Sequence, residues 1–167
     1  VVIFVFRYSS INIIKNILDG SHVKSSKDRS ITDQRLLDYN TDQFIILQLQ
    51  GFVFFGTANS LYEKVKTLGS SKETALKFLV MDLGLVQGID SSAVKSFEKL
   101  AQYLGKENID LILVSLSQRL RVPFEADGFT VKNYNHMHEY ATLDQATEFC
   151  EDQIIKSESQ KMQKAKQ

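Results

Sequence analysis

The sequence has little of several features that mark specialised classes of protein. One cysteine, Cys150, among 167 residues excludes an intrachain disulfide framework and suits a reducing compartment. The 20 basic residues equal the 20 acidic ones, and no basic stripe interleaved with aromatics predicts binding to nucleic acid. One proline and eight glycines, without a repeat at solenoid spacing, argue against a low-complexity or repeat protein. The remaining composition, 43% hydrophobic, is that of one globular domain with extensions.

One short hydrophobic run, VVIFVF at Val1–Phe6, opens the sequence. Six residues are too few to span a bilayer, which takes roughly 20, and no charged segment precedes them as in a signal peptide. The run is compatible with a buried strand and also with the cytoplasmic end of a membrane helix. Between Arg7 and Arg29, five basic residues stand against two acidic ones. That excess fits the positive-inside bias of a segment that follows a membrane helix.

Little regular structure is predicted before residue 44. Ile11, Ile14 and Leu18 have a weak helical spacing that ends at Gly20, and residues 21–40 are polar and typical of a linker. At the other end, the polar residues 156–167 (KSESQKMQKAKQ) predict a disordered tail.

From residue 44 onward, strands and helices are predicted to alternate. Two short strands, Phe44–Leu49 and Phe52–Phe55, are close enough in sequence to pair as a hairpin. The later predictions are helix 58–68, strand 78–81, helix 94–104, strand 109–114, a further helix that ends at Gly128, a short strand within 129–140, and a helix after Thr142. The helix that ends at Gly128 starts at Ser117, or near Val122 if Pro123 lies in its first turn. This order predicts an α/β fold: a mostly parallel central sheet of about five strands after the initial hairpin, with helices packed against it.

Asp90, Ser91 and Ser92 lie where a predicted strand leads into a predicted helix. Serine and aspartate are favoured helix N-caps, because their oxygens accept hydrogen bonds from the free backbone N–H groups. A phosphate on one of these serines would also gain from the helix N-terminus and would add close to two negative charges beside Asp90. A helix cap and a phosphorylation switch are therefore both compatible with this motif.

No enzymatic motif accompanies these serines, so an enzyme is not predicted. The sequence has no G-x-S-x-G nucleophile elbow, and the histidines, His22, His136 and His138, are expected in exposed loops. Two neighbouring histidines do not make a structural zinc site, and Cys150 is expected on a buried helix face. Leu83–Gly88 (LGLVQG) has neither a Walker lysine nor a G-x-G-x-x-G pattern, and is predicted to be a loop.

The stretch FLVMDLGLVQGIDSSAV, Phe78–Val94, resembles the signature of STAS domains, in which an apolar strand ending in Asp leads through a loop to Asp-Ser-Ser-Gly at a helix start. The order of elements over residues 44–155 resembles the same family. Residues 1–43 resemble the end of the last membrane helix and the linker of SulP-type anion transporters. The resemblance thus divides the chain into a membrane-helix end with a linker (1–43), a STAS domain (44–155) and a polar tail (156–167).

The resemblance implies a regulatory or interaction domain on the cytoplasmic side of a membrane, which modulates the transport, assembly or trafficking of its own transmembrane portion. It also implies a homodimer and a kinase or regulatory protein as partners, and no cofactor beyond a weak nucleotide site. The alternative is a stand-alone phosphoswitch of the anti-sigma-factor-antagonist type. The residues that the resemblance assigns are Ser92 and Ser91 for phosphorylation, and Asp82, Gly84, Gly88, Asp90 and Ala93 for a switch loop or partner surface. Ala93 departs from the glycine common at that position, and its methyl group is expected to narrow the room at the helix start.

Overall fold

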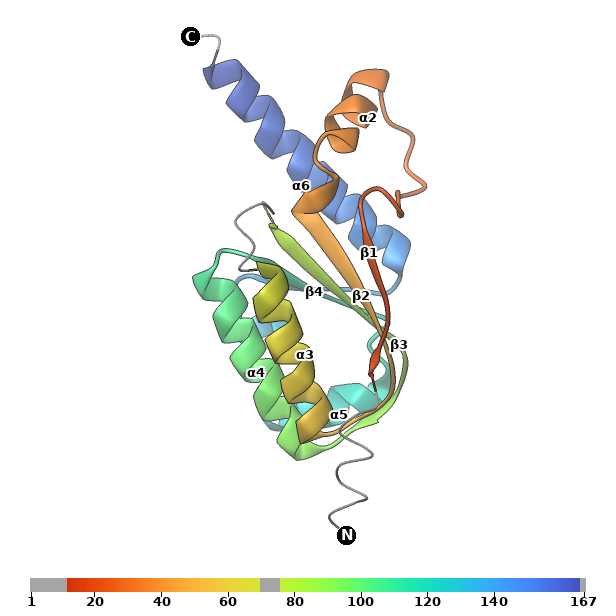
Figure 1. Cartoon of the computed structure of the whole chain (residues 1–167), viewed down its shortest axis with the longest axis vertical. Helices are drawn as coiled ribbons and strands as arrows, with labels where there is room; N and C mark the ends of the chain where they lie inside the picture. Colours follow the sequence, from red (N-terminus) through yellow and green to blue (C-terminus); the bar gives the residue numbers. More distant parts are fainter. Residues whose placement is uncertain (1–11, 70–75, 166–167) are drawn as a thin grey trace.

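The computed structural model describes residues 12–69 and 76–165, which form a five-stranded sheet with helices on both faces (Figure 1). The strands, which lie side by side in this order, are β1 (Ile14–Asp19), β2 (Phe44–Val53), β3 (Phe78–Ile89), β4 (Asp110–Val114) and β5 (Met137–Tyr140). β1 pairs with β2 antiparallel, and the other three pairs are parallel. The predicted α/β class with an antiparallel start is confirmed. The predicted membrane-helix end at Val1–Phe6 lies outside the described residues.

The antiparallel start is built from other segments than the sequence predicts. β2 runs unbroken from Phe44 to Val53, so a hairpin between Phe44–Leu49 and Phe52–Phe55 is wrong. Gly51 has a positive φ of 79°, but the chain continues through it with a shift of register against β3. The antiparallel partner of β2 is β1, in a segment whose spacing is weakly helical. Its β-branched isoleucines favour a strand, and pairing with β2 outweighs the helical spacing.

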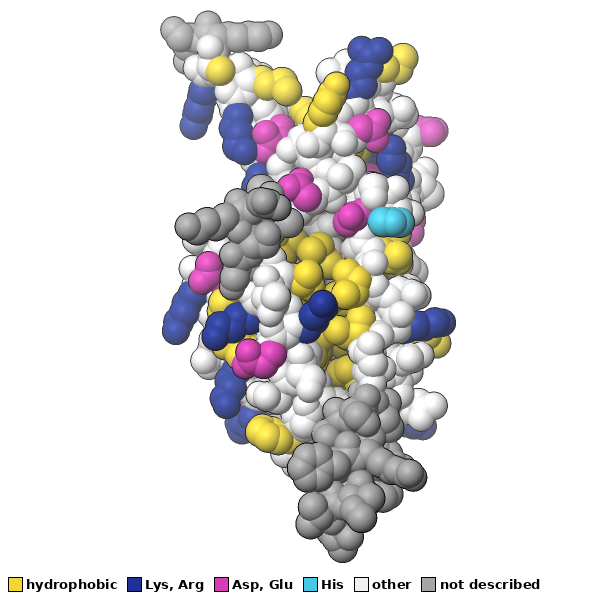
Figure 2. Space-filling model, viewed as in Figure 1, with side chains coloured by type: hydrophobic (Ala, Val, Ile, Leu, Met, Phe, Trp, Pro, Cys, Tyr) yellow, Lys and Arg dark blue, Asp and Glu magenta, His cyan; other side chains and the backbone are white. Residues whose placement is uncertain are grey.

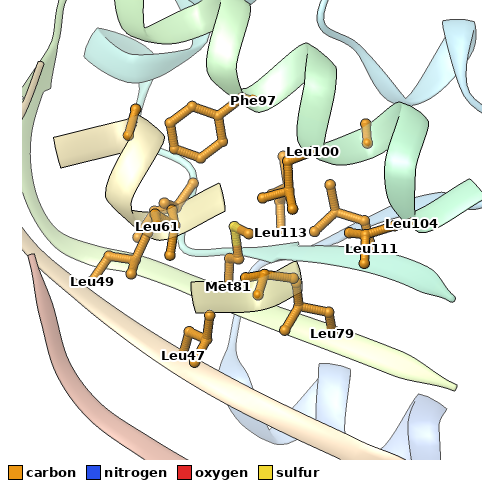
Figure 3. Close-up of a cluster of buried hydrophobic side chains, with 14 of the residues drawn as sticks. Leu47, Leu49, Leu61, Leu79, Met81, Phe97, Leu100, Leu104, Leu111 and Leu113 are labelled. Atoms are coloured by element: carbon orange, nitrogen blue, oxygen red, sulfur yellow. The ribbon is translucent and has the colours of Figure 1, made fainter. Parts of the chain in front are cut away.

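Helices cover both faces of the sheet and enclose two apolar cores. On one face lie α3 (Phe55–Gly69), α4 (Ser91–Lys106) and α5 (Gln118–Ala126), and on the other lie α2 (Ile31–Asp38) and α6 (Leu143–Lys164). Successive strand residues point to opposite faces, so the continuous apolar runs of β2, β3 and β4 supply both cores. Figure 3 shows the core beneath α4, with Leu47, Leu79, Met81, Leu111 and Leu113 from the sheet and Phe97, Leu100 and Leu104 from the helix. The opposite core includes Ile46, Val80, Ile112, Ala146, Cys150 and Ile154.

β3 is longer than its sequence predicts. Leu83–Gly88, predicted to be a loop, continues the strand as far as Ile89. β3 pairs with β2 up to Val53↔Ile89, whereas β4 accompanies it only as far as Asp82. β2 and β3 therefore extend past β4 as a two-stranded ribbon tip, residues 50–53 and 83–89. Glycine weakens a strand, which is why the sequence favours a loop, but the pairing with β2 compensates.

Helix α5 starts at Gln118 with Ser117 as its N-cap, so the start at Ser117 is confirmed and the alternative start near Val122 is wrong. A proline inside a helix removes one backbone hydrogen bond. Leu120 and Phe124 are buried against the core on either side of that position. Their burial holds the first turn of α5 in place despite the proline.

Helix α6 extends to Lys164, so the disordered tail predicted over 156–167 is wrong for its described part. The helix begins with the predicted capping box of Thr142 and Gln145. Farther along, Glu158 accepts hydrogen bonds from Lys77, which directly precedes β3, and from Lys161 of the same helix. These bonds stabilise the C-terminal turns of α6, whose sequence is polar and lacks the apolar spacing of a buried helix. None of the helices in 12–69 and 76–165 is both long and apolar enough to cross a bilayer.

The segment between β1 and α2, predicted to be a polar linker, is bound to α6 through Ser25–Arg29, called the strap. Two serines of the strap each hold one carboxylate with both a backbone N–H and a hydroxyl. Ser25 binds Glu151 in this way, with its N–H at 2.9 Å from Oε1. Ser26 binds Asp144 with its N–H at 2.7 Å from Oδ1 and its hydroxyl at 2.7 Å from Oδ2.

Two cations of the strap pair with three acidic side chains of α6, Glu148, Glu151 and Asp152. Arg29 Nε lies 2.9 Å from Glu151 Oε2, and its Nη1 lies 2.7 Å from Asp152 Oδ1. Lys27 Nζ lies 3.0 Å from Glu148 Oε1 and 2.9 Å from Asp152 Oδ2. The side chains of Arg29 and Glu151 are only 8% and 4% exposed, so that pair is the buried centre of the strap.

Acid is expected to weaken the strap. Hydrogen bonds from Ser26 lower the pKa of Asp144. Burial by itself would raise the pKa of Asp152, but hydrogen bonds and charge from Lys27 and Arg29 outweigh it and lower that pKa. Because both pKa values are lower in the folded chain than in the unfolded one, their contribution to stability is complete above the unfolded value, near 3.8, and is lost as the pH falls through the folded values. The free energy of unfolding should therefore decrease below a pH of about 4.

Urea unfolding at several pH values between 5 and 2.5 would measure this decrease, as long as unfolding stays reversible. The double variant Asp144→Asn/Asp152→Asn lacks both titrating groups and should show a shallower decrease. Equal slopes for the variant and the unmodified chain would contradict the assignment.

Candidate functional site

The candidate site is the junction where the ribbon tip leads into α4, and Asp90 organises it. Asp90 has an extended backbone (φ −88°, ψ 160°) and is the N-cap of α4. Its Oδ1 accepts hydrogen bonds from the N–H of Ala93 and from the hydroxyl of Ser92, both at 2.7 Å. Its own N–H donates to the carbonyl of Val53 at 3.1 Å, which ties the junction to β2. The predicted helix cap is confirmed, with the aspartate as the capping residue.

Ser91 and Ser92 form the start of α4, and both are exposed. The first N–H groups of a helix have no partner within the helix, and the positive end of its dipole favours a negative group there. An anionic side chain of a partner, or a phosphate on either serine, would meet these favourable N–H groups. The carboxylate of Asp90 opposes a second negative charge at the same place. Because Asp90 already supplies one negative charge, the arrangement suits reversible phosphorylation of a serine better than permanent binding of a free anion.

Ala93, the departure from the expected glycine, lies on the inner side of the first turn of α4. It is 0% exposed and belongs to the core together with Val94 and Phe97. The methyl group therefore fills space beneath the helix and takes none on the solvent side, where Ser91 and Ser92 lie. The predicted narrowing of the helix start concerns the core and leaves the two hydroxyls accessible.

The structure divides the predicted switch surface into two places. Asp82 and Gly84 lie where β4 stops accompanying β3, and Asp82 Oδ1 accepts a hydrogen bond from the N–H of Gly84 at 3.0 Å. Asp90 lies eight positions after Asp82, and the seven residues between them are extended strand, which corresponds to roughly 25 Å along the chain. Gly88, in contrast, lies two residues before Asp90 and belongs to the junction. Sequence proximity suggested one cluster because the stretch between the two aspartates reads as a compact loop.

Exposed apolar side chains of the ribbon tip and of the start of α3 lie at the same end of the molecule as the junction, and no motif in the sequence marks them. Phe52 and Leu85 of the tip are 44% and 52% exposed, and Phe55 at the start of α3 is 53% exposed. The ring of Phe52 occupies the space beside Gly88, where a Cβ atom would lie 2.5 Å from its Cε2. Arg119 of α5 donates to the carbonyl of Gln87 at 3.2 Å and adds a positive charge to this end of the molecule. Aromatic and arginine side chains are enriched where proteins bind one another.

A second apolar surface lies between β1 and α3. Figure 2 shows apolar side chains gathered there on the front face of the molecule. They line a groove of about 350 Å³, whose lining includes Ile14, Ile17, Leu61 and Lys64. The edge position of β1 leaves the groove open, because α3 packs over the inner strands.

The histidines lie apart from the junction. His22 is exposed in a turn, as expected, and His136 also lies in a turn, but it is half-buried, so its expected exposure is wrong. The expectation of an exposed loop is wrong for His138 in both respects. His138 belongs to β5, and its Nε2 lies 3.1 Å from Asp110 Oδ2. His136 is half-buried with its Nε2 2.7 Å from the carbonyl oxygen of Ala101. Cys150 is fully buried as predicted, and burial raises the pKa of its thiol. Within the described ranges, no three His, Cys, Asp or Glu side chains come together as a metal site.

The capping role of Asp90 predicts the effect of removing its carboxylate. Asp90→Ala should lower the free energy of unfolding by about 0.5–2 kcal/mol, because the N–H of Ala93 and the hydroxyl of Ser92 lose their acceptor. Asp90→Asn keeps an acceptor oxygen and should stay close to the unmodified chain. Urea unfolding of the three proteins tests this, and an Ala variant as stable as the Asn variant would refute the capping role.

Comparison with known proteins identifies relatives of this chain. In an alignment 171 positions long it is 28% identical to the vacuolar basic amino acid transporter VSB1 of Saccharomyces cerevisiae, and the alignment covers 98% of this chain and 16% of the transporter. The structure is similar to the murine Slc26a9 anion transporter in the inward-facing state, with a TM-score of 0.63 and 14% identity over 90% of this chain and 24% of that one. It is also similar to the unphosphorylated anti-sigma factor antagonist SpoIIAA, with a TM-score of 0.52 and 20% identity over 64% of this chain and 86% of that one. At these identities the two structural similarities show the fold alone.

The region that folds around the central sheet also matches a family model. The match covers residues 37–146, from the end of α2 to the first turn of α6, and is described as the STAS domain. It contains the four strands β2 to β5, the ribbon tip and the Asp90–Ser92 junction. The chain belongs to the STAS domain family.

Proposed function

We propose that this chain is the STAS domain of a SulP-type membrane transporter, on the cytoplasmic side, and that it regulates or assembles the transporter without catalysing a reaction. The similarity to the anion transporter, which covers 90% of this chain against 64% for the stand-alone antagonist, carries the proposal. The alignment with the yeast transporter likewise covers 98% of the chain and reaches beyond the matched family region. Elements outside that region, β1 and most of α2 and α6, thus favour a transporter over a free switch protein.

The surface of the domain is consistent with a role in binding other protein segments. The exposed Phe52, Phe55 and Leu85 offer apolar area at one end, and Ser91 and Ser92 offer a place where charge can change. In this proposal the transmembrane portion of the same protein is the main partner. The solute would be selected by that portion, and the chain spans only 16% of the length of its transporter relative.

Fractionation of the natural protein tests the proposal. An antibody raised against the folded domain would be used on cells that express the gene, after membranes are washed with alkaline carbonate. We expect a band far above 19.0 kDa, the mass of this chain, that stays in the washed membrane pellet. A band near 19 kDa in the supernatant would refute the transporter proposal and favour the stand-alone phosphoswitch.

Phosphorylation of Ser92 is a separate part of the proposal, and Ser91 is its alternative position. The exposure of both hydroxyls at the helix N-terminus supports it. Phosphopeptide mapping of the protein from its own cells tests it. Phosphate at Ser92 is the expected result, and its repeated absence from both serines would leave the motif as a helix cap.

A further inference from the structure

The serine hydroxyls of the strap donate hydrogen bonds to carboxylates of α6. Phosphorylation of such a serine would turn this attraction into repulsion. The hydroxyl of Ser26 donates to Asp144 Oδ2 at 2.7 Å, and its backbone N–H donates to Oδ1 of the same carboxylate. A phosphate ester cannot donate from that oxygen, and at neutral pH it brings close to two negative charges. The same position that now attracts Asp144 would then repel it.

Ser26 is also the serine of the strap that an enzyme can reach. Ser26 is exposed, whereas Ser25 is half-buried against Glu151, which is only 3% exposed. The segment around Ser26 lies between β1 and α2 and belongs to no helix or strand. Lys24 and Lys27, whose side chains are 57% and 40% exposed, flank it with positive charge. An exposed serine between basic residues, in a segment without regular secondary structure, suits the substrate groove of a kinase that selects basic sequences.

We propose that Ser26 is phosphorylated by a protein kinase and that the phosphate releases the strap from α6. In this step the Ser26 Oγ forms a bond to the γ-phosphorus of a nucleoside triphosphate, and the bond from that phosphorus to the bridging oxygen breaks. The hydroxyl proton leaves to a base of the kinase, and the nucleoside diphosphate is the leaving group. The modification concerns the strap alone and does not depend on whether the chain is part of a transporter.

The charged groups around Ser26 indicate that a phosphate there would weaken the binding of the strap to α6. The N-terminus of α6 favours negative charge, but Asp144 in its first turn already occupies that position. The nearby cations are engaged. Lys27 binds Glu148 and Asp152, and Arg29 binds Glu151 and Asp152. Lys24 binds Asp38 at 2.6 Å. The phosphate therefore meets a carboxylate without a free cation among its described neighbours. Release would uncover the acidic face of α6 and free residues 25–29.

Peptide mapping tests the modification itself. Cleavage before aspartate gives the fragment Asp19–Lys27, which contains Ser21, Ser25 and Ser26, and fragmentation spectra distinguish the three positions. The protein is taken from its own cells under several growth conditions. Phosphate at Ser26 is expected, and phosphate confined to the other two serines, or none on the fragment, overturns the proposal.

Hydrogen exchange tests the release. Phosphoserine is placed at position 26 of the 167-residue chain by site-specific incorporation, and exchange is followed at the backbone N–H groups of Ser25 and Ser26. Both N–H groups donate to carboxylates of α6, so their exchange should accelerate at least tenfold. The matched control carries phosphoserine at Ser117, an exposed N-cap of α5 without a side-chain capping bond, and should change strap exchange less than twofold.

A rescue variant separates charge repulsion from general unfolding. Asp144→Asn removes the charge that opposes the phosphate and should bring exchange of the phosphorylated strap back to within threefold of the unphosphorylated variant. The N–H groups of Leu111 and Ile112 in the buried strand β4 report on global unfolding. Unchanged strap exchange with phosphoserine 26, or equally fast exchange with and without Asp144→Asn, overturns the proposed release.

Discussion

Arg29→Ala should lower the free energy of unfolding by about 3 kcal/mol, because removing one member of a buried ion pair leaves the other charged group buried without its partner. Glu151 is that group, with its side chain only 4% exposed. The N–H and hydroxyl of Ser25 still donate to its carboxylate, which keeps the loss at the low end of the usual range. In a chain of this size, the loss corresponds to a decrease in Tm of roughly 6–12 °C.

Lys24→Ala is the matched control for Arg29→Ala. Lys24 also joins the segment before α2 to an acidic residue, Asp38, but the two side chains are 57% and 55% exposed. Exposed pairs contribute about 1 kcal/mol or less, so this variant should unfold close to the unmodified chain. Urea unfolding of both variants measures the difference. Equally small losses in the free energy of unfolding would mean that the Arg29–Glu151 pair contributes no more to stability than an exposed ion pair does.

Phe97→Ala should be the most destabilising substitution in the α4 core, with an expected loss of about 3–5 kcal/mol. Phe97 is 1% exposed, and its ring lies 5.3 Å from that of Phe124 and 5.9 Å from that of Phe129, measured between centroids. Alanine would remove both aromatic contacts and leave a cavity between α4 and α5. Because Phe97 also anchors the helix that starts at Asp90, the junction should become more mobile.

Phe52→Ala provides the comparison for Phe97→Ala, since it removes the same ring from the exposed ribbon tip. Phe52 is 44% exposed and contacts Phe54 with a centroid distance of 4.7 Å. Its replacement should cost less than about 1 kcal/mol, as is usual at partly exposed positions. Thermal unfolding of both variants gives the ranking. A loss at Phe52 equal to that at Phe97 would place the ribbon tip, contrary to its exposure, within the cooperative core.

The buried strands and the helix caps were predictable because their causes are local. The runs FIILQL, FLVM and IDLILV each supply side chains to both faces of the sheet, and such runs are typical of strands covered on both sides. The caps at Asp90 and Thr142 depend on residues within a turn of each other. The resemblance to STAS domains also follows from contiguous residues around Asp90, and the family match confirms it.

The parts that the sequence did not predict depend on partners far apart in the chain. β1 is a strand because it pairs with β2, some 30 residues later, and its own spacing indicates only a weak helix. The strap is ordered because Ser25 and Arg29 reach Glu151, more than 120 residues later. The acidic residues of α6 read as an ordinary solvated helix face, and no local pattern shows that it is covered. Composition shows that residues 21–40 are polar, but it could not show that Ser25–Arg29 bind α6 or that α2 forms at Ile31–Asp38.

The length by which β3 extends past β4 has a consequence for association between chains. Past Asp82, one edge of β3 has no neighbouring strand. Such an edge offers unpaired backbone groups to which a strand of another chain can add, which is a route to aggregation. On this part of β3 two backbone groups are occupied, because Asp82 accepts from the N–H of Gly84 and Arg119 donates to the carbonyl of Gln87. A foreign strand that paired there would have to displace both charged side chains. Asp82 and Arg119 thus protect the ribbon tip against the addition of a strand from another chain, while its exposed apolar side chains stay available to a specific partner.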